Sequence, residues 1–206
     1  MRWCVPEIAN TSFCYMPAVA DAAPDVAAVI LAGGRGLRMG GADKGLLDYR
    51  QRPLIEWVLE AVRPQVSEAL ISANRNLEVY AKYGCRILPD ALPDFPGPLA
   101  GVLAAMDAVN TEWLLVVPCD TPYLPADLVR GLWHAAQAEG VSIAIAADTA
   151  QAHYTIMLVQ TWLAESLRAY LNSGQRAVHL WQQAFNPARA LFPGHRFENL
   201  NTLKDL

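Results

Sequence analysis

The chain has 206 residues, of which 53% are hydrophobic, and a formal net charge of −4 at neutral pH. This length suits one domain with a sizeable core, and a mildly acidic balance argues against a nucleic-acid-binding protein, which would need a basic stripe. The sequence contains no run of 18 apolar residues that could span a membrane and no signal-peptide pattern, so we expect a cytoplasmic protein.

Cysteine and histidine spacing supports neither a metal centre nor a disulfide framework. Cys4, Cys14, Cys85 and Cys119 include no C-x-x-C pair, and they are too few for a disulfide scaffold. The four histidines are scattered, and their spacing predicts no Ser-His-Asp set. We therefore expect reduced thiols and no protein nucleophile.

Regular hydrophobic patterning begins near residue 25. Residues 1–24 lack a clear period and contain three prolines, so we interpret them as an extension outside a single domain that spans residues 25–206. The apolar run 26–31 ends at glycines, which is typical of a strand buried on both faces. Pro53 then opens a helix with one apolar face.

Strands and helices alternate along the remainder of the chain. We expect Pro125 to open one helix and Thr161 to cap another, which Asn172-Ser173-Gly174 ends. This alternation predicts βαβ units, and hence a three-layer α/β/α domain with a mostly parallel sheet whose ligands bind beyond the carboxyl ends of the strands. The expected strands are residues 69–73, 86–88, 113–117, 141–146, 155–159 and 190–192, and further helices are expected at 77–82, at 99–109 and before the last strand.

The loop at residues 31–45 has the composition of a phosphate-binding loop. It contains six glycines, two arginines and one lysine directly after the first buried strand. Glycines let backbone N–H groups approach a phosphate closely, and the cations supply opposing charge. Met39 interrupts a G-x-G-x-x-G pattern, and Lys44 is followed by Gly45 rather than Ser or Thr. We therefore predict a phosphate site that is neither a dinucleotide-binding loop nor a P-loop.

Polar side chains follow several of the other expected strands. Asp120, in the segment P-C-D-T-P, could hold Mg²⁺ over bound phosphates or cap the following turn. Asn74 and Asp90 could contact a base or ribose, or form turns. Gly97 and Gly101 open a helix with small residues, which suit either close approach to an anion or tight packing.

Two of these segments carry specific motifs. Residues 31–47 read L-A-G-G-x-x-x-R-M-G-G-x-D-K-G-L-L, and residues 118–122 read P-C-D-T-P. In both, the chain resembles the molybdenum cofactor guanylyltransferase family, and the resemblance runs from about residue 26 to the end. Supporting matches are R-P-L at 52–54, A-N-R at 73–75, P-D at 89–90, P-G-P-L-A-G at 96–101 and N-L-N-T at 199–202.

The resemblance implies a nucleotidyltransferase fold of the Rossmann type and a Mg²⁺-dependent reaction. In that reaction the GMP part of GTP is joined to the terminal phosphate of molybdopterin or Mo-molybdopterin, and pyrophosphate is released. Position by position, it implies that Lys44 and Asp120 are catalytic and that Asp120 binds the metal. The implied nucleotide-binding residues are Leu31, Ala32, Gly33, Gly34, Lys44, Asn74, Asp90 and Asp120, and those on the molybdopterin side are Gly97, Gly101, Asn199 and Asn201.

Two positions depart from the family pattern. Gln51 stands where the family usually has glycine, and Leu203 stands where it usually has proline.

The implied substrates are GTP and molybdopterin, with molybdoenzymes or their chaperones as further candidate partners, and we expect a monomer.

Two other functions fit parts of the same pattern. One is the cytidylyltransferase of the same cofactor, which resembles L-A-A-G at the opening loop; the doubled glycine after Ala32 favours guanine. The other is a non-catalytic protein that binds nucleotide or molybdopterin. The presence of Lys44 and Asp120 favours an enzyme.

Overall fold

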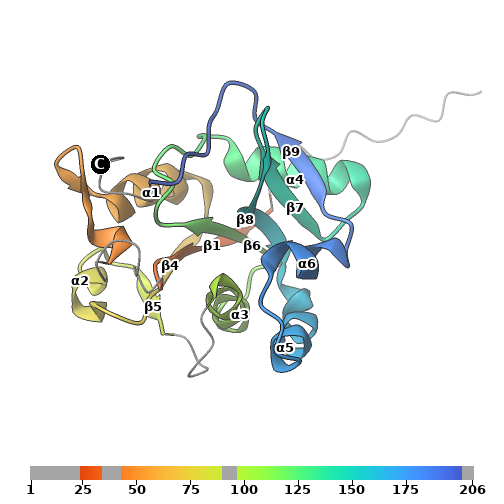
Figure 1. Ribbon diagram of the computed structural model, residues 1–206, viewed down its shortest axis with the longest axis horizontal. Helices are drawn as coiled ribbons and strands as arrows, with labels where there is room; N and C mark the ends of the chain where they lie inside the picture. The colour runs from red at the N-terminus through yellow and green to blue at the C-terminus, as the bar shows by residue number, and fades with distance from the viewer. Residues whose placement is uncertain (1–23, 34–42, 90–96, 201–206) are drawn as a thin grey trace, which may run out of the picture.

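A seven-stranded sheet forms the centre of the computed structural model, which describes residues 24–33, 43–89 and 97–200 (Figure 1). Its strand order is β5-β4-β1-β6-β8-β7-β9, and β8 alone runs antiparallel to its two neighbours, β6 and β7. The mostly parallel sheet is therefore confirmed. The strands are β1 (Val26–Leu31), β4 (Glu68–Ser72), β5 (Arg86–Leu88), β6 (Trp113–Pro118), β7 (Ile143–Ala147), β8 (Ala152–Gln160) and β9 (Ala188–Leu191).

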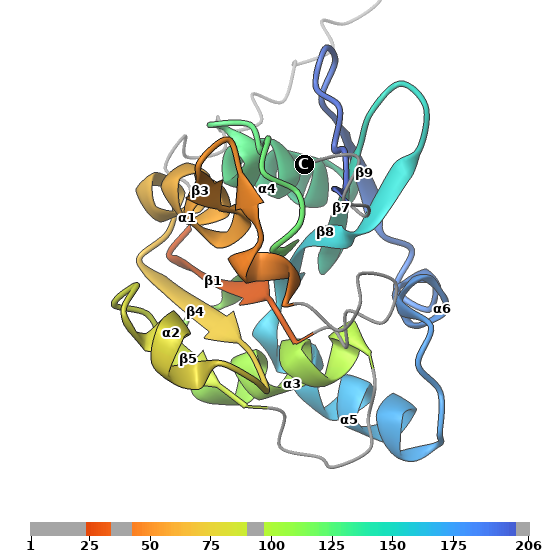
Figure 2. The same ribbon diagram turned by 60° about the vertical axis from the view of Figure 1, so that its left-hand side comes forward.

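Helices cover both faces of the sheet, as predicted (Figures 1 and 2). On one face lie α1 (Leu54–Val62) and α4 (Leu128–Glu139), and on the other lie α3 (Pro98–Ala108), α5 (Ala164–Asn172) and α6 (Val178–Gln183). The short α2 (Leu77–Ala81) contacts the edge strand β5. None of the helices described has both the length and the apolar character needed to cross a bilayer. The expected extension, residues 1–24, lies outside the described residues except for Pro24.

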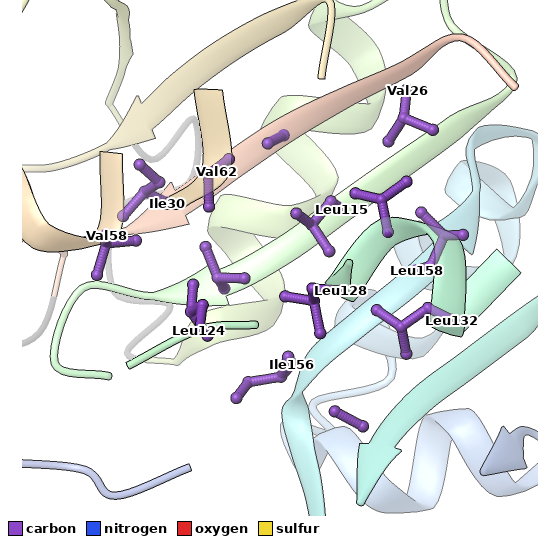
Figure 3. Close-up of a cluster of buried hydrophobic side chains, with 14 of the residues drawn as sticks. Val26, Ile30, Val58, Val62, Leu115, Leu124, Leu128, Leu132, Ile156 and Leu158 are labelled. Carbon is purple, nitrogen blue, oxygen red and sulfur yellow. The ribbon is translucent and has the colours of Figure 1, made fainter. Parts of the chain in front are cut away.

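The strand β1 is buried on both faces, which explains its unbroken apolar sequence. Val26 and Ile30 pack in the cluster under α1 and α4, whereas Val29 packs in the cluster on the opposite face. Figure 3 shows the first cluster, in which Val58 and Val62 of α1 lie over β1. Burying one such side chain contributes about 1.5–3 kcal/mol, so β1 anchors the loop that follows it.

The helix α4 begins at Leu128, three residues later than the predicted start at Pro125. The Leu128 amide donates to the Pro125 carbonyl at 3.2 Å, so residues 125–128 form a turn before the helix. The side chain of Gln65, which lies just after the end of α1, binds both this turn and the helix: its Nε2 donates to the Pro125 carbonyl and its Oε1 accepts from the Val129 amide. A distant side chain thus caps this helix.

The prediction that Thr161 caps a helix is wrong. Thr161 begins the 3-10 turn η4 (Thr161–Leu163), and its hydroxyl donates to the carbonyl of Thr111 at 2.8 Å, so it ties this turn to the segment before β6. The α-helix proper, α5, begins at Ala164 and ends at Asn172, where Gly174 adopts a left-handed φ of 86°. That end agrees with the predicted Asn172-Ser173-Gly174 stop.

Smaller elements were not predicted. The hairpin of β2 (Asp48–Tyr49) and β3 (Arg52–Pro53) follows the 3-10 turn η2 (Lys44–Leu46), and a third 3-10 turn, η3 (Arg63–Gln65), follows α1. The strands β7 and β8 are joined directly by residues 148–151, and their pairing shifts register between Ile145 and Ala146.

Candidate active site

The carboxyl ends of four strands meet at one edge of the sheet. Backbone hydrogen bonds continue the pairing past the strand ends: the Ala32 amide donates to Ser72 at 2.8 Å, and the Cys119 amide donates to Leu31 at 3.1 Å. The Ala73 amide likewise donates to Leu88. Figure 2 shows β1 and β4 pointing the same way toward this edge. The loops that carry the predicted site residues therefore start side by side.

Lys44 and Asp120 meet at this edge. Lys44 lies in η2, and Asp120 follows β6; the Lys44 Nζ donates to the Asp120 Oδ2 at 3.0 Å. Their side chains are 25% and 12% exposed, so both remain within reach of a substrate. The two residues predicted to be catalytic, which are 76 positions apart in the sequence, are thus brought into contact.

The second carboxylate oxygen of Asp120 fits a cation. Within the described residues, Asp120 Oδ1 is buried and has no hydrogen-bond partner. A buried anionic oxygen without a donor is costly, and a bound Mg²⁺ would satisfy it. No group of three or more His, Cys, Asp or Glu side chains in the described part of the chain could hold a metal by itself. Asp120 would therefore hold Mg²⁺ together with phosphate oxygens and water, as is usual for this ion.

Cys119 lies beside Asp120 and is buried. Burial, and then the negative charges of Asp120 and Asp43, raise the pKa of the Cys119 thiol far above its ordinary value. The protonated form of the thiol is therefore favoured, and a protonated thiol is a poor nucleophile. Cys85 and Cys119 are both free thiols, whereas Cys4 and Cys14 lie outside the described residues.

The nucleotide-binding residues predicted after β1 and β4 lie against each other. A Cβ added to Gly33 would stand 3.2 Å from Asn74 Nδ2, so the amide of Asn74 lies directly over this glycine. Ala32 is buried next to it, and Leu31 is half-buried. The structure thus brings Leu31, Ala32, Gly33 and Asn74 to the same edge as Lys44 and Asp120. Two other predicted contacts, Gly34 and Asp90, lie outside the described residues.

Gly101 has a packing role in this structure. A Cβ at this position would lie 2.3 Å from Ser72 Oγ and 3.0 Å from Leu31 Cδ2, so only glycine lets α3 rest on the ends of β4 and β1. Gly97, in contrast, is exposed, and a Cβ there would meet no described atom within 4 Å. Contact of either glycine with the pterin stays a prediction.

The carboxyl-terminal segment is tied to the Asp120 loop. The hydroxyl of Thr121, which is fully buried, donates to Asn199 Oδ1 at 2.6 Å, and the Leu200 amide donates to the Asp120 carbonyl at 2.9 Å. Asn199 therefore lies beside the Asp120 loop, and its implied contact with the pterin stays a prediction; Asn201 lies outside the described residues.

A second acid–base pair lies at the end of the β7–β8 hairpin. His153 Nε2 and Asp148 Oδ2 are 2.8 Å apart, and the His153 ring packs on Phe197, two residues before Asn199. The hydrogen bond to His153, followed by those from the backbone of Gln151 and Ala150, lowers the pKa of Asp148 to about 2. Through Phe197 this pair contacts the segment that carries Asn199, and it was not predicted from the sequence.

The partners of Asp43 were not predicted from the sequence. Tyr80 Oη donates to Asp43 Oδ1 at 2.6 Å, and Asn76 Nδ2 donates to Asp43 Oδ2 at 3.0 Å. The available signal was a lone carboxylate in an otherwise cationic loop, directly before Lys44. No sequence pattern indicates which residues of α2 would reach it.

Comparisons with known proteins find one family over most of the chain. The model of the MobA-like NTP transferase domain family matches residues 28–187. The molybdenum cofactor guanylyltransferase of Serratia proteamaculans is 46% identical over 184 residues, which cover 88% of this chain and 92% of that protein. The enzyme of the same name from Cupriavidus pinatubonensis is 42% identical over 188 residues, covering 88% of this chain and 94% of that protein.

Solved structures show the same fold. Molybdopterin-guanine dinucleotide biosynthesis protein A from Archaeoglobus fulgidus aligns with a TM-score of 0.69 at 21% identity, over 87% of this chain and 94% of that one. The 2-C-methyl-D-erythritol 4-phosphate cytidylyltransferase from Thermus thermophilus aligns with a TM-score of 0.66 at 20% identity, over 86% and 93%. At these identities the likeness establishes the nucleotidyltransferase fold alone.

Proposed function

The chain belongs to the MobA-like NTP transferase domain family, and we propose that it is a guanylyltransferase that transfers GMP from GTP to the terminal phosphate of molybdopterin. The observation that carries this proposal is the contact between Lys44 and Asp120 at the carboxyl edge of the sheet. A buried carboxylate oxygen beside a lysine costs stability unless a cation and phosphates complete the arrangement, so this contact favours a nucleotide site with Mg²⁺.

The reaction needs charge stabilisation more than it needs a protein nucleophile. An oxygen of the acceptor phosphate attacks the α-phosphorus of GTP, a new phosphorus–oxygen bond forms, and the bond to the departing pyrophosphate breaks. Negative charge builds on the α-phosphate and on the leaving group, and groups already in place stabilise it best. The neutral thiol of Cys119 agrees with a mechanism in which the protein supplies no nucleophile.

Lys44 and Asp120 divide this task. The Lys44 ammonium would neutralise phosphate oxygens, and the backbone after β1 would offer N–H groups at close range because Gly33 carries no side chain. Asp120 would hold Mg²⁺ through its carboxylate, and the ion would supply further positive charge at the phosphates. The Mg²⁺ requirement is part of the proposal and rests on the unpartnered Oδ1 of Asp120.

The guanine specificity is supported by the opening loop and by the relatives. The chain has Gly33 after Ala32, in agreement with the guanylyl signature, and the matched relatives are named guanylyltransferases. The cytidylyl alternative is therefore not favoured. A cytoplasmic location, a monomeric state and docking of molybdoenzymes or their chaperones stay predictions.

In the experiment that tests this proposal, the purified chain is incubated with Mg²⁺, with molybdopterin or Mo-molybdopterin, and with either GTP or CTP. The product is identified by mass spectrometry. We expect a GMP adduct and pyrophosphate with GTP, and little product with CTP. A CMP adduct would move the assignment to the cytidylyl relative. If neither nucleotide gave an adduct with intact substrates, the chain would be a binding protein or would use a different acceptor.

A further inference from the structure

Asp43, the residue before Lys44, is held on both carboxylate oxygens by side chains that come from a separate part of the fold. Tyr80 of α2 donates to one oxygen at 2.6 Å, and Asn76, just before α2, donates to the other at 3.0 Å. We infer that Asp43, Tyr80 and Asn76 form a clamp whose function is to position Lys44 toward the phosphates of the nucleotide. This inference rests on the proposed function, because it takes GTP as the target of Lys44.

The clamp restricts the backbone that carries Lys44. The Asp43 carbonyl accepts from the Leu46 amide at 3.1 Å and the Lys44 carbonyl accepts from the Leu47 amide at 3.2 Å, which closes the 3-10 turn η2. With the Asp43 carboxylate fixed and the turn closed, the Lys44 side chain starts from one direction and its ammonium reaches Asp120. A lysine side chain has many rotamers, so fixing its origin keeps the charge at the site for more of the time.

The surroundings of Tyr80 favour its protonated hydroxyl, which can donate a hydrogen bond. Its side chain is fully buried, and burial together with the bond to Asp43 raises the pKa of Tyr80 far above its ordinary value. Its hydroxyl passes directly over Gly45, where an added Cβ would lie 2.5 Å from the hydroxyl oxygen. The glycine after Lys44 therefore makes room for the clamp.

The side chain of Asn76 binds Asp43 instead of capping the helix that follows it. It occupies the N-cap of α2 with a left-handed φ of 51°, yet its side chain makes no capping hydrogen bond to that helix. An N-cap asparagine usually stabilises its helix through such a bond. Here the amide serves Asp43 instead. Because Asn76 and Asn74 belong to the same connection between β4 and α2, the clamp ties the nucleoside side of the site to Lys44.

A double-mutant cycle tests whether Tyr80 acts through Lys44. We expect Tyr80→Phe to lower kcat/KM for GTP about threefold to tenfold, mostly in kcat, as loss of one hydrogen bond implies. In a Lys44→Ala background, Tyr80→Phe should cause no further loss. The matched control is Tyr170→Phe, which removes a hydroxyl bonded to the Ala177 carbonyl in the α5–α6 region and should leave kinetics unchanged. An equal loss with and without Lys44 would overturn the inference.

A second readout does not depend on turnover. Brief acetylation with acetic anhydride, followed by peptide mass spectrometry, gives the relative rate at Lys44 with exposed Lys82 as the internal reference. We expect Tyr80→Phe and Asp43→Asn to raise the Lys44 rate severalfold, and Tyr170→Phe to leave it unchanged. An unchanged Lys44 rate in both folded clamp variants would overturn the inference. If the wild-type chain transferred no GMP, the proposed function would fail while the labelling still decided whether the clamp positions Lys44.

Discussion

The turn between β2 and β3 holds two residues in a left-handed backbone conformation, and this conformation affects the stability of the fold. Arg50 and Gln51 connect the two strands with left-handed φ values of 52° and 67°, a geometry that favours glycine. A residue other than glycine in this region destabilises the folded state by roughly 1–2 kcal/mol. Glycine removes this cost, but its greater freedom in the unfolded chain offsets about 0.5–1 kcal/mol of the gain. We expect Gln51→Gly to raise the free energy of unfolding by about 0.5–1 kcal/mol and the Tm by about 1–4 °C. Thermal unfolding followed by circular dichroism measures this shift.

The opposite change, from glycine to alanine at a residue with a left-handed φ, is the control for this prediction. Gly84 has a φ of 69°, and a Cβ there would meet no described atom within 4 Å, so Gly84→Ala changes only the backbone preference. We expect it to lower the free energy of unfolding by about 1 kcal/mol. If Gln51→Gly left the Tm unchanged or lowered it while Gly84→Ala behaved as expected, the assumed strain at Gln51 would be absent.

Three further changes test other parts of the account. Lys44→Ala should lower kcat/KM for GTP at least about tenfold in steady-state assays, and unchanged constants would remove its role at the phosphates. Gly101→Ala should lower the urea midpoint by an amount equivalent to about 1–3 kcal/mol, because its Cβ would meet Ser72 Oγ, whereas Gly97→Ala should not; equal effects would contradict the packing argument. Asp148 has its pKa lowered to about 2, so its contribution to stability is present above about pH 4 and is lost as the pH falls toward 2. Asp148→Asn should therefore flatten the fall of Tm between pH 4 and pH 2, and an unchanged slope would show that the carboxylate does not stabilise the fold.

Much of the fold could be predicted because its central strands are buried on both faces. Strands β1 and β6 are continuous apolar runs, and they appear where the sequence placed them. The antiparallel direction of β8 was not predicted. The predicted strands 141–146 and 155–159 lie farther apart in the sequence than β7 and β8 do, so the hairpin connection at residues 148–151 was not recognised. The register shift in their pairing breaks the alternation that would have revealed the full strand.

The predicted helix starts were wrong where contacts with distant residues determine them. Pro125 has the right sequence for a helix start, but Gln65 binds the Pro125 carbonyl and the Val129 amide and so fixes the start at Leu128. Thr161 has the right sequence for a cap, but its hydroxyl bonds to Thr111 instead. In both cases the deciding partner is more than 45 residues away, beyond the reach of a local pattern.

The candidate site was predicted in its principal residues and missed in their support. Lys44 and Asp120 stand in specific motifs, and their contact follows from two adjacent parallel strands. Tyr80 lies in a helix that the sequence predicted, but its contact with Asp43 depends on how that helix is oriented against η2. The motifs therefore indicated two side chains that the structure brings into contact, whereas the contacts of Asp43 could be found only in the structure.

The most direct test of the central claim follows the phosphorus atoms of GTP. The chain would be given molybdopterin, Mg²⁺ and GTP labelled either at the α- or at the γ-phosphate, with Asp120→Asn as a folded control verified by circular dichroism. We predict that the α-label enters the pterin product and the γ-label leaves in pyrophosphate, and that Asp120→Asn loses both. Release of the γ-label as free phosphate with formation of GDP, or near-normal transfer by Asp120→Asn, would contradict nucleotidyl transfer at this site.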